Sequence, residues 1–306
     1  GFEENIINYI FQSINSNTLD KIYVDNVGNL ICYKKGKKSS KKVMISAHVD
    51  EVGIQIMKKI DERKYSFKVL GNIKCWNLLQ QRMRSGNKMG IIFANDETNI
   101  KAYNYSNLFI NIISTDDNVN IGDVFSFDNK FEESNEYICG KAIDNRICCN
   151  ILIDFINNMP CLDNDIYCVF TVQEEIGMRG IRVAKTNIRP NIYINLDVSP
   201  ESEMNNIEIK KGVGIVSSNS IGVSSCDLFK LMVDVAKKNN IIHQIEVSDC
   251  GTNELIISNE KDNGTKTIAI SLPCKYIHTA NTIVHKNDIK EFKKLLEIYI
   301  KNTREH

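Results

Sequence analysis

The sequence lacks an excess of charge of either sign, a long apolar run and an internal repeat. Lys plus Arg and Asp plus Glu both number 38, so the formal net charge is zero, and no overall field favours nucleic acid or an anionic membrane. No stretch approaches the run of about 20 apolar residues that a membrane helix needs. We therefore expect no nucleic acid and no membrane among the partners. The 306 residues, 42% hydrophobic and 25% charged, fit a globular protein with one large domain and an insert, or with two domains.

The 10 cysteines form no framework that indicates a bound metal or disulfides. No pair has CxxC spacing, and only Cys148 and Cys149 are adjacent. This pattern excludes a zinc finger and a disulfide scaffold, and favours reduced, mostly buried thiols. Residues 1–5 show no basic segment followed by an apolar one, as a secretory signal would. We expect a cytoplasmic protein.

Four strand-like apolar runs lead to residues that can carry chemistry. Residues 43–47 lead to His48 and Asp50, residues 167–171 to Glu174 and Glu175, residues 192–196 to Asp197, and residues 267–273 to His278. A further acid, Asp144, stands just before a helix-like stretch. In open α/β sheets the ligand crevice lies outside the carboxyl ends of the strands, so these side chains can share one site. Imidazole and carboxylate groups suit zinc, cobalt or manganese.

The adjacent carboxylates Glu174 and Glu175 are the most informative pair. Neighbouring side chains on an extended strand point in opposite directions. Where the strand ends and the backbone turns, both can reach one site from different angles, so that one holds a metal and the other handles a proton. Two carboxylates are costly to bury without a partner, and a bound cation would explain both. A solvated turn is the alternative for this pair taken alone.

The other candidates also have simpler alternatives. His48 and Asp50 are two residues apart, hence on one face of a strand. A ligating imidazole usually donates its other N–H to a carboxylate, so His48 as a ligand with Asp50 as its partner fits metal chemistry. The alternative is a buried core histidine beside a helix-capping aspartate. Asp144, at a turn into a helix, has the alternative of an ordinary N-cap.

Five motifs follow one another along the chain. They are residues 47–51 (AHVDE), 140–146 (GKAIDNR), 173–180 (QEEIGMRG), 196–197 (LD) and 276–278 (YIH). In order and local wording they resemble the glutamyl aminopeptidase and tetrahedral aminopeptidase family of dinuclear metallopeptidases. The resemblance runs from about Val24 to the last helix. Five motifs in register are far more specific than any one of them.

The resemblance implies two divalent metal ions per subunit, zinc or cobalt, with manganese as a third candidate. The implied ligands are His48 and Asp197 on one ion, Glu175 and His278 on the other, and Asp144 on both. A bridging carboxylate is needed because two cations about 3.5–4 Å apart repel each other. Asp50 becomes a supporting catalytic acid. Glu174 is left without a metal and becomes the general base that acts on a two-metal-activated water.

Two residues depart from the family pattern. Asn145 stands where family members often carry a second Asp beside the bridging one, which slightly reduces the charge of the site. Asn253 follows Gly251 and Thr252, where the family usually has Gly-Thr-Asp near the substrate and subunit contacts. The second departure bears on specificity more than on chemistry.

The alternation of strands and helices predicts an α/β fold, with a mixed central sheet covered by helices on both faces. The resemblance makes it the zinc-peptidase type. Residues 53–57 alternate between apolar and polar and are expected to continue this sheet. From residue 67 to residue 133 short strand-like pieces are separated by turn residues, which is typical of a small all-β insert. We therefore predict a catalytic domain of residues 1–66 and 134–306 and an inserted β domain of residues 67–133.

The predicted function is a metal-dependent aminopeptidase that removes N-terminal residues from peptides. The resemblance also implies a homo-oligomer, in which dimers assemble through the insert into a dodecamer. One alternative is a glycoside hydrolase of the endoglucanase kind, which needs two carboxyls about 5–5.5 Å or 6.5–9.5 Å apart across a sugar. Glu174 and Glu175 are chain neighbours, and the histidines would have no role. A second alternative is a catalytically silent scaffold, which loss of Glu174 or of any expected ligand would support, although all six of these positions keep their residues. The preferred N-terminal residue and the native metal stay open.

Overall fold

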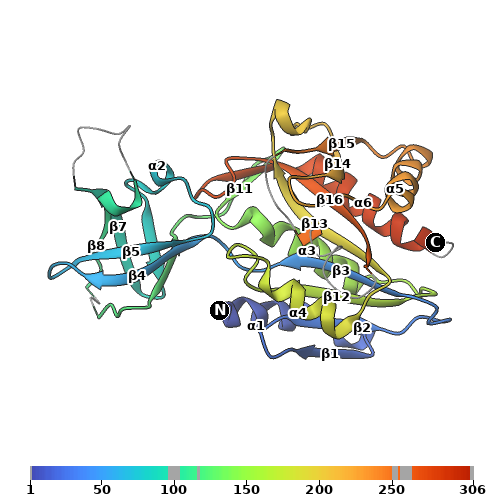
Figure 1. The fold of residues 1–306 in the computed structure, drawn as a ribbon, viewed down its shortest axis with the longest axis horizontal. Coiled ribbons are helices and arrows are strands. Elements are labelled where there is room, and N and C mark those ends of the chain that lie inside the picture. The colour runs from blue at the N-terminus through green and yellow to red at the C-terminus, as the bar shows by residue number, and fades with distance from the viewer. Residues whose placement is uncertain (1, 96–103, 116–117, 250–253, 256–263, 304–306) are drawn as a thin grey trace.

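The computed structural model describes residues 2–95, 104–115, 118–249, 254–255 and 264–303. The chain forms a larger α/β part and a smaller closed β-barrel, which lies at the left in Figure 1. The larger part is built on a sheet of 11 strands, and the barrel has its own hydrophobic core. The prediction of an α/β fold with a small all-β insert is confirmed.

The central sheet is mixed, with parallel strands in the middle and antiparallel strands at both edges. Its strands, in spatial order, are β1 (Lys21–Val24), β2 (Leu30–Lys34), β12 (Asp165–Thr171), β3 (Lys42–His48), β13 (Ile192–Pro200), β16 (Lys266–Lys275), β17 (Thr282–His285), β11 (Tyr137–Gly140) and β10 (Glu132–Glu133). Two further strands, β14 (Val213–Ser218) and β15 (His243–Val247), branch from β16. The strands β12, β3, β13 and β16 run parallel to one another, so their carboxyl ends meet at one edge.

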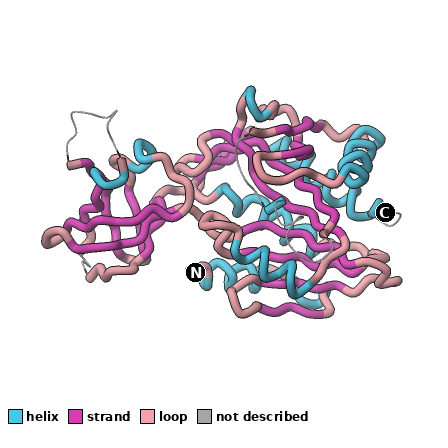
Figure 2. Tube along the Cα trace, in the orientation of Figure 1, coloured by secondary structure: helices cyan, strands magenta, loops and turns pink. Residues whose placement is uncertain are grey.

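Helices cover both faces of this sheet (Figure 2). They are α1 (Glu4–Ser13), α3 (Ile143–Asn157), α4 (Arg179–Ile188), α5 (Cys226–Lys238) and α6 (Lys286–Asn302). Short 3-10 helices cover Ser16–Thr18, Tyr105–Asn107 and Glu203–Asn205. Helix α4 packs on one face, whereas α1, α3, α5 and α6 share a core with the other. In the part of the chain that the structure describes, no helix combines the length and apolar character of a membrane span.

The central strands are apolar on both faces because both faces are covered. On β3, Val43, Ile45 and Ala47 belong to the core beneath α3, while Met44 packs beneath α4. All four side chains are 0% exposed. This is the pattern of a doubly covered parallel sheet, where apolar residues run continuously instead of alternating with polar ones.

The barrel closes six antiparallel strands around an apolar interior. The strands are β4 (Gly53–Lys59), β5 (Lys64–Leu70), β6 (Arg82–Ser85), β7 (Lys88–Ala94), β8 (Leu108–Ile112) and β9 (Val124–Phe127), with the short helix α2 (Cys75–Leu78) between β5 and β6. Ile54, Ile110 and Phe125 are 0% exposed inside it. Closure leaves no free strand edge, which a small isolated sheet would expose.

The prediction that residues 53–57 continue the central sheet is wrong. They form β4, which pairs with β5 and β9 in the barrel. A Cβ at Gly53 would lie 2.6 Å from the carbonyl oxygen of Phe125, so only glycine allows β4 to approach β9. The alternating pattern was read correctly as a strand, but alternation does not tell which sheet a strand joins.

The barrel begins and ends earlier in the chain than the predicted insert of residues 67–133. The barrel begins at Gly53 and its last strand ends at Phe127. Strand β10, Glu132–Glu133, pairs with β11 in the central sheet. The six strands of the barrel thus lie within residues 53–127.

Candidate metal centre

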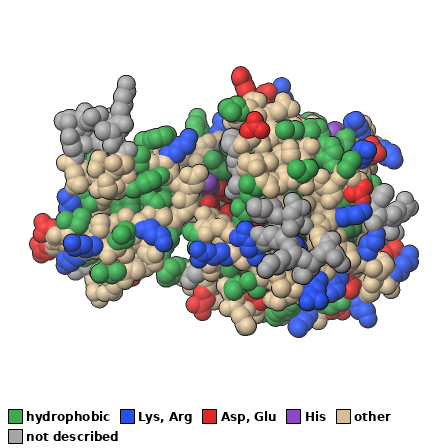
Figure 3. Space-filling view, viewed as in Figure 1, with side chains coloured by type: hydrophobic (Ala, Val, Ile, Leu, Met, Phe, Trp, Pro, Cys, Tyr) green, Lys and Arg blue, Asp and Glu red, His purple; other side chains and the backbone are tan. Residues whose placement is uncertain are grey.

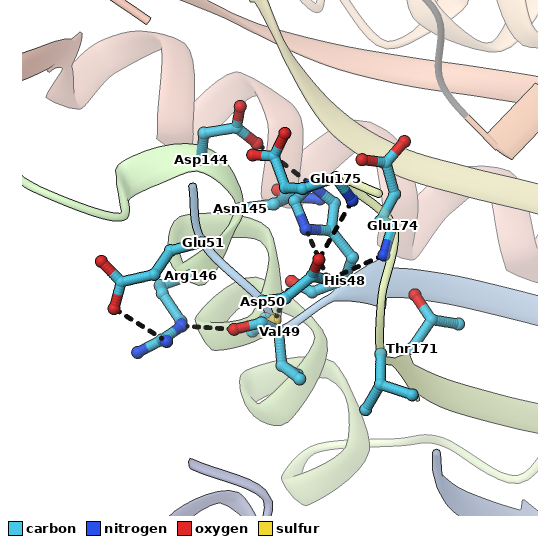
Figure 4. Close-up of polar contacts among 12 residues, drawn as sticks. His48, Val49, Asp50, Glu51, Asp144, Asn145, Arg146, Thr171, Glu174 and Glu175 are labelled. Atoms are coloured by element: carbon cyan, nitrogen blue, oxygen red, sulfur yellow. Dashed lines mark hydrogen bonds and ion pairs between the residues drawn. The ribbon is translucent and has the colours of Figure 1, made fainter. Parts of the chain in front are cut away.

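The end of β3 and the segment after β12 are tied together by Asp50. Its Oδ1 accepts the backbone N–H of Glu174 and its Oδ2 that of Glu175, both at 3.0 Å (Figure 4). A third bond, from Val49 N to Thr171 O at 2.8 Å, joins the same two segments. Asp50 therefore fixes the backbone from which both glutamate side chains start.

The turn that follows is shaped by glycines. Gly177 has φ of +120°, a backbone region that side chains rarely adopt. A Cβ at Gly180 would lie 2.4 Å from both Asn29 Oδ1 and the carbonyl oxygen of Val172. Glycine there lets α4 start directly against the end of β12. The pair Glu174 and Glu175 is thus held between a strand end and a helix start.

A first group of side chains gathers around His48, the last residue of β3. His48 Nε2 lies 3.1 Å from Asp144 Oδ1 and 3.7 Å from Asp197 Oδ1. His48 Nδ1 lies 3.5 Å from Asp50 Oδ1, an ion-pair distance, and forms no hydrogen bond within the described part of the chain. The potential ligand atoms of His48, Asp144 and Asp197 all lie within 4.8 Å of one another, and all three residues are buried.

A second group gathers around His278, which follows β16. His278 Nε2 lies 3.2 Å from Asp144 Oδ2 and 3.4 Å from Glu175 Oε2, and these groups also fall within 4.8 Å of one another. His278 Nδ1 lies 2.8 Å from the carbonyl oxygen of Asn72. A carbonyl only accepts, so Nδ1 carries the proton and Nε2 faces the carboxylates.

Asp144 is the one residue that belongs to both groups. Its Oδ1 faces His48 and its Oδ2 faces His278. Among the described hydrogen bonds, neither oxygen accepts a backbone N–H, so Asp144 is not an ordinary helix cap. Its backbone is extended, with φ −75° and ψ 108°, and the peptide bond to Asn145 is cis.

The charges of this cluster perturb one another strongly. Burial, followed by the charge of Asp144, raises the pKa of Glu175 to about 8. Burial opposes a charged His278, but its hydrogen bond to Asp144 and the charge of Glu175 raise its pKa to about 9. Burial likewise raises the pKa of Asp144, yet the hydrogen bonds from His278 and His48 outweigh it and lower that pKa. Bound protons and imidazolium charges offset the negative charge of these carboxylates, as a bound cation would.

The donor set fits divalent metal ions. Each group supplies one imidazole nitrogen and two carboxylates, which suits zinc and other borderline or hard cations. Glu175 Oε1 is buried and has no hydrogen-bond partner among the residues that the structure describes. A buried carboxylate oxygen left without a partner is costly, and coordination would satisfy it.

Glu174 stands apart from both groups. It is 9% exposed, and its carboxylate forms no hydrogen bond to any described residue. Burial, the largest effect, raises the pKa of this carboxyl well above its usual value, although His48 acts in the opposite direction.

The rim of the site contains a charged cluster between the barrel and the larger part. Lys141 Nζ lies 2.8 Å from Glu51 Oε1 and 3.0 Å from Ser126 Oγ on β9. Arg146 donates to the carbonyl oxygen of Val49 at 2.7 Å. A cleft opens here, lined by Glu51, Val52, Phe127, Ala142, Asp144, Glu175, His278, Thr279 and Thr282. Figure 3 shows histidine and acidic side chains in the notch beside the barrel.

The structure brings together the seven side chains expected to form the site. The five expected ligands form the two groups, Asp50 supports their backbone, and Glu174 lies beside them. Asn145 Nδ2 donates to the carbonyl oxygen of Leu196 at 2.9 Å. This amide therefore fastens the start of α3 to the strand that carries Asp197. Asn253 lies outside the described residues.

Some neighbours of the site were missed. Lys141 and Glu51 lie within the predicted motifs, and their opposite charges near the acidic residues could have signalled a pair. Asn72 gave no signal, because it acts through its backbone carbonyl. Glu254 gave none either. It accepts hydrogen bonds from Ser46, Thr171 and Tyr193, which lie far from it along the chain.

Comparison with known proteins decides which family has this arrangement. Residues 28–295 match the sequence profile described as M42 glutamyl aminopeptidase. The chain belongs to the M42 glutamyl aminopeptidase family. It is thus a hydrolase of a metalloaminopeptidase family, and the predicted family and enzyme class are confirmed.

Relatives of this M42 chain match it along nearly all of its length. A putative aminopeptidase of Acetivibrio thermocellus is 32% identical, over 97% of this chain and 92% of the relative. The lysyl aminopeptidase of Pyrococcus furiosus is 26% identical, over 99% of this chain and 93% of the relative.

Solved structures show the same M42 fold. Aminopeptidase APDkam598 of Desulfurococcus kamchatkensis superposes with a TM-score of 0.91 at 26% identity, covering 99% of this chain and 90% of that one. The TET1 peptidase of Pyrococcus horikoshii, which can assemble into a tetrahedron or a large octahedral shell, has a TM-score of 0.88 at 26% identity, with 99% and 95% covered. PhTET1-12s, a dodecamer, has 0.87 at 26%, with 99% and 94% covered.

One similar structure carries a different functional name. A Thermotoga maritima protein described as an endoglucanase superposes with a TM-score of 0.81 at 30% identity, covering 98% of this chain and 92% of that one. The glycoside-hydrolase alternative therefore has a structural counterpart in this fold, and the geometry of the site must decide between the two reactions.

Proposed function

We propose that this M42 chain is a two-metal aminopeptidase that removes N-terminal residues from peptides. The observation that carries the proposal is the position of Asp144. Its two oxygens face different histidines, and it is the shared member of two groups of three potential ligands. A carboxylate shared in this way is what a pair of neighbouring cations requires.

His48, Asp144 and Asp197 would hold one ion, and Asp144, Glu175 and His278 the other. Zinc, cobalt and manganese all accept these nitrogen and oxygen ligands. When bound, two such ions would polarise the scissile carbonyl and lower the pKa of an attacking water. Three protein ligands on each ion leave room for water and substrate.

Glu174 acts as the general base in this proposal. Its backbone is held by Asp50, and its buried carboxylate has a raised pKa and no hydrogen-bond partner among the described residues. It takes a proton from the water whose oxygen attacks the carbonyl carbon. It then delivers that proton to the leaving nitrogen as the C–N bond breaks.

The two alternatives are less well supported. Hydrolysis of a glycoside needs two carboxyls facing each other across the sugar, whereas here the acids converge on two histidines. A silent scaffold would have no reason to keep Glu174 buried without a partner beside those groups. We therefore favour peptide hydrolysis.

We further propose that the barrel mediates assembly of a homo-oligomer, by analogy with the dodecameric and shell-forming relatives. Trp76 and Ile121, on the part of the chain that forms the barrel, are 60% and 72% exposed. Large exposed apolar side chains are costly to leave in water and mark contact surfaces. We also propose a cytoplasmic location and an independent barrel domain whose strands lie between Gly53 and Phe127.

One panel of assays tests the proposed reaction. The purified protein is stripped with a chelator, reloaded with zinc, cobalt or manganese, and offered aminoacyl-p-nitroanilides, their N-acetylated forms and carboxymethyl cellulose. We expect metal-dependent release of p-nitroaniline from substrates with a free amine only. Release of reducing sugar from cellulose without peptide turnover would reject the proposal, and no turnover with any substrate would favour the silent scaffold.

A further inference from the structure

A further buried glutamate, Glu254, lies near the two groups of potential ligands and has no role in the proposed mechanism. It is 0% exposed. Its Oε1 accepts a hydrogen bond from Thr171 Oγ1 at 2.7 Å, and its Oε2 accepts one from Tyr193 OH at 3.0 Å. Ser46 Oγ also donates to Oε2, and Asn195 Nδ2 lies 3.4 Å from it. One carboxylate thus gathers three hydroxyls and an amide.

These partners come from three of the four parallel strands that lead to the site. Ser46 is on β3, two residues before His48. Thr171 ends β12, three residues before Glu174. Tyr193 and Asn195 are on β13, ahead of Asp197. Glu254 therefore connects three strands. They are β3, which ends at His48, β12, which leads to Glu174, and β13, which carries Asp197.

The strand register places these groups on one face of the sheet. Ser46 pairs with Asn195 across β3 and β13, and Thr171 pairs with His48 across β12 and β3. Residues paired in this way point to the same side, as do residues two apart on one strand. His48 and Asp197 hence rise from the same face as the Glu254 network, two positions after Ser46 and Asn195 respectively.

The composition of the network shows that it is not a simple ion pair. Among the described residues no cation contacts Glu254, and its partners are the hydroxyls and the amide already named. Ser46 Oγ and Tyr193 OH also lie 2.7 Å apart. Burying a carboxylate is costly unless its oxygens are hydrogen-bonded, and a network in which each member depends on the others fixes a single arrangement.

We infer that Glu254 is a positioning residue for the metal centre, which holds the ends of β3, β12 and β13 in the spacing that metal binding and Glu174 need. This inference rests on the proposed function. Partners that hydrogen-bond metal ligands affect metal affinity or activity about 10–100-fold when they are removed, and Glu254 supports the ligands one step further out, through the strands that carry them. The network acts through Ser46, Thr171 and Asn195, not by contact with substrate.

Cobalt binding tests the inference independently of turnover. Wild type and Glu254→Ala are stripped and titrated with cobalt, and the visible absorption of the bound cobalt is recorded. We expect Glu254→Ala to bind cobalt about 10–100-fold more weakly, with a changed spectrum. Glu254→Gln keeps the shape and can exchange hydrogen bonds with hydroxyls that rotate, so it is expected to recover most of the affinity.

Asp288→Ala is the matched control. Asp288 is also a buried carboxylate, 1% exposed, and it accepts the backbone N–H groups of Lys210 and Gly212 at 2.7 and 2.9 Å. Its loss should lower the unfolding temperature without changing cobalt affinity. If Glu254→Ala behaves in the same way, Glu254 is a structural anchor only and the inference is overturned.

Thr171→Val carries the test if Glu254→Ala does not fold. Valine keeps the shape of threonine and removes the hydroxyl that donates to Glu254 Oε1. Weaker cobalt binding in this variant supports the inference, and wild-type affinity with a wild-type spectrum overturns it. Failure of the wild type itself to bind cobalt would reject the proposed function instead, so the two failures are distinguishable.

Discussion

Asp50 accepts the backbone N–H of Glu174 at 3.0 Å, and so the residue two places after His48 fixes the start of the proposed base. Asp50 and Glu174 are 124 residues apart in the sequence. Together with the bonds from Glu175 N to Asp50 and from Val49 N to Thr171 O, this contact couples the strand that supplies a potential ligand to the turn that supplies the proposed base. The position of the Glu174 side chain in the site therefore depends on how its backbone is held.

Replacing Glu174 by glutamine is expected to leave metal content unchanged and to lower kcat. The amide has nearly the shape of the carboxylate but cannot take a proton, and general acid–base catalysis contributes about 10²–10⁴-fold. Elemental analysis and steady-state kinetics on the same preparation measure both effects. Near-normal turnover in a variant with full metal content would show that another group is the base.

Asp50→Asn tests the contact between Asp50 and the turn. Only one oxygen remains to accept the two N–H groups of Glu174 and Glu175, so one backbone donor is left unpaired at a cost of about 1–3 kcal/mol. We expect a lower unfolding free energy and a reduced kcat, with metal still bound. Urea unfolding and kinetics check this, and a variant with both values unchanged would remove Asp50 from the account.

Stability of the metal-free protein is expected to fall as pH rises. The folded-state pKa values of Glu175, about 8, and His278, about 9, lie above their ordinary values of 4.5 and 6.5. The folded protein therefore binds more protons than the unfolded chain in this range, and stability present at low pH is lost as pH rises through these values. Metal binding displaces the same protons and strengthens with pH.

Thermal unfolding with and without a chelator measures this linkage. The gap between the unfolding temperatures of the metal-loaded and stripped protein should widen from about pH 6 to about pH 9. Glu175→Gln is the control that removes one of the titrating groups. A gap that narrows with rising pH would contradict the proposed exchange of protons for metal.

Charged substitutions on the barrel are expected to break the assembly without loss of chemistry. Trp76→Asp and Ile121→Asp place a carboxylate at residues that are 60% and 72% exposed. A charge buried in a subunit contact is costly, so the particle should become smaller while turnover of small substrates persists. Light scattering with Met204→Asp as a control, at a residue 72% exposed outside the barrel, decides whether assembly uses this surface.

Much of the site was predictable because it lies at the ends of strands. The apolar runs before His48, Glu174 and Asp197 identify buried parallel strands, and parallel strands bring their carboxyl ends to one edge. Once these strands are placed side by side in the sheet, the residues that follow them lie together. The family resemblance then supplied the pairing of ligands, which chain order alone leaves open.

What the sequence could not show are contacts without a local pattern. Asn72 orients His278 through a backbone carbonyl, which every residue possesses. Glu254 meets Ser46 and Thr171 across 208 and 83 residues of sequence, and no periodicity records such distances. Residues 53–57 were assigned to the wrong sheet for a related reason, since an alternating strand fits either one.

Metal content of three variants tests the central claim, that Asp144 is shared by two ions. Asp144 belongs to both groups, whereas Asp197 and Glu175 each belong to one. Elemental analysis of Asp144→Ala, Asp197→Ala and Glu175→Ala, beside wild type, should give two ions per chain in wild type and the lowest content in Asp144→Ala. If Asp144→Ala still carries two ions per chain, Asp144 is not the shared ligand and the two-metal account is contradicted.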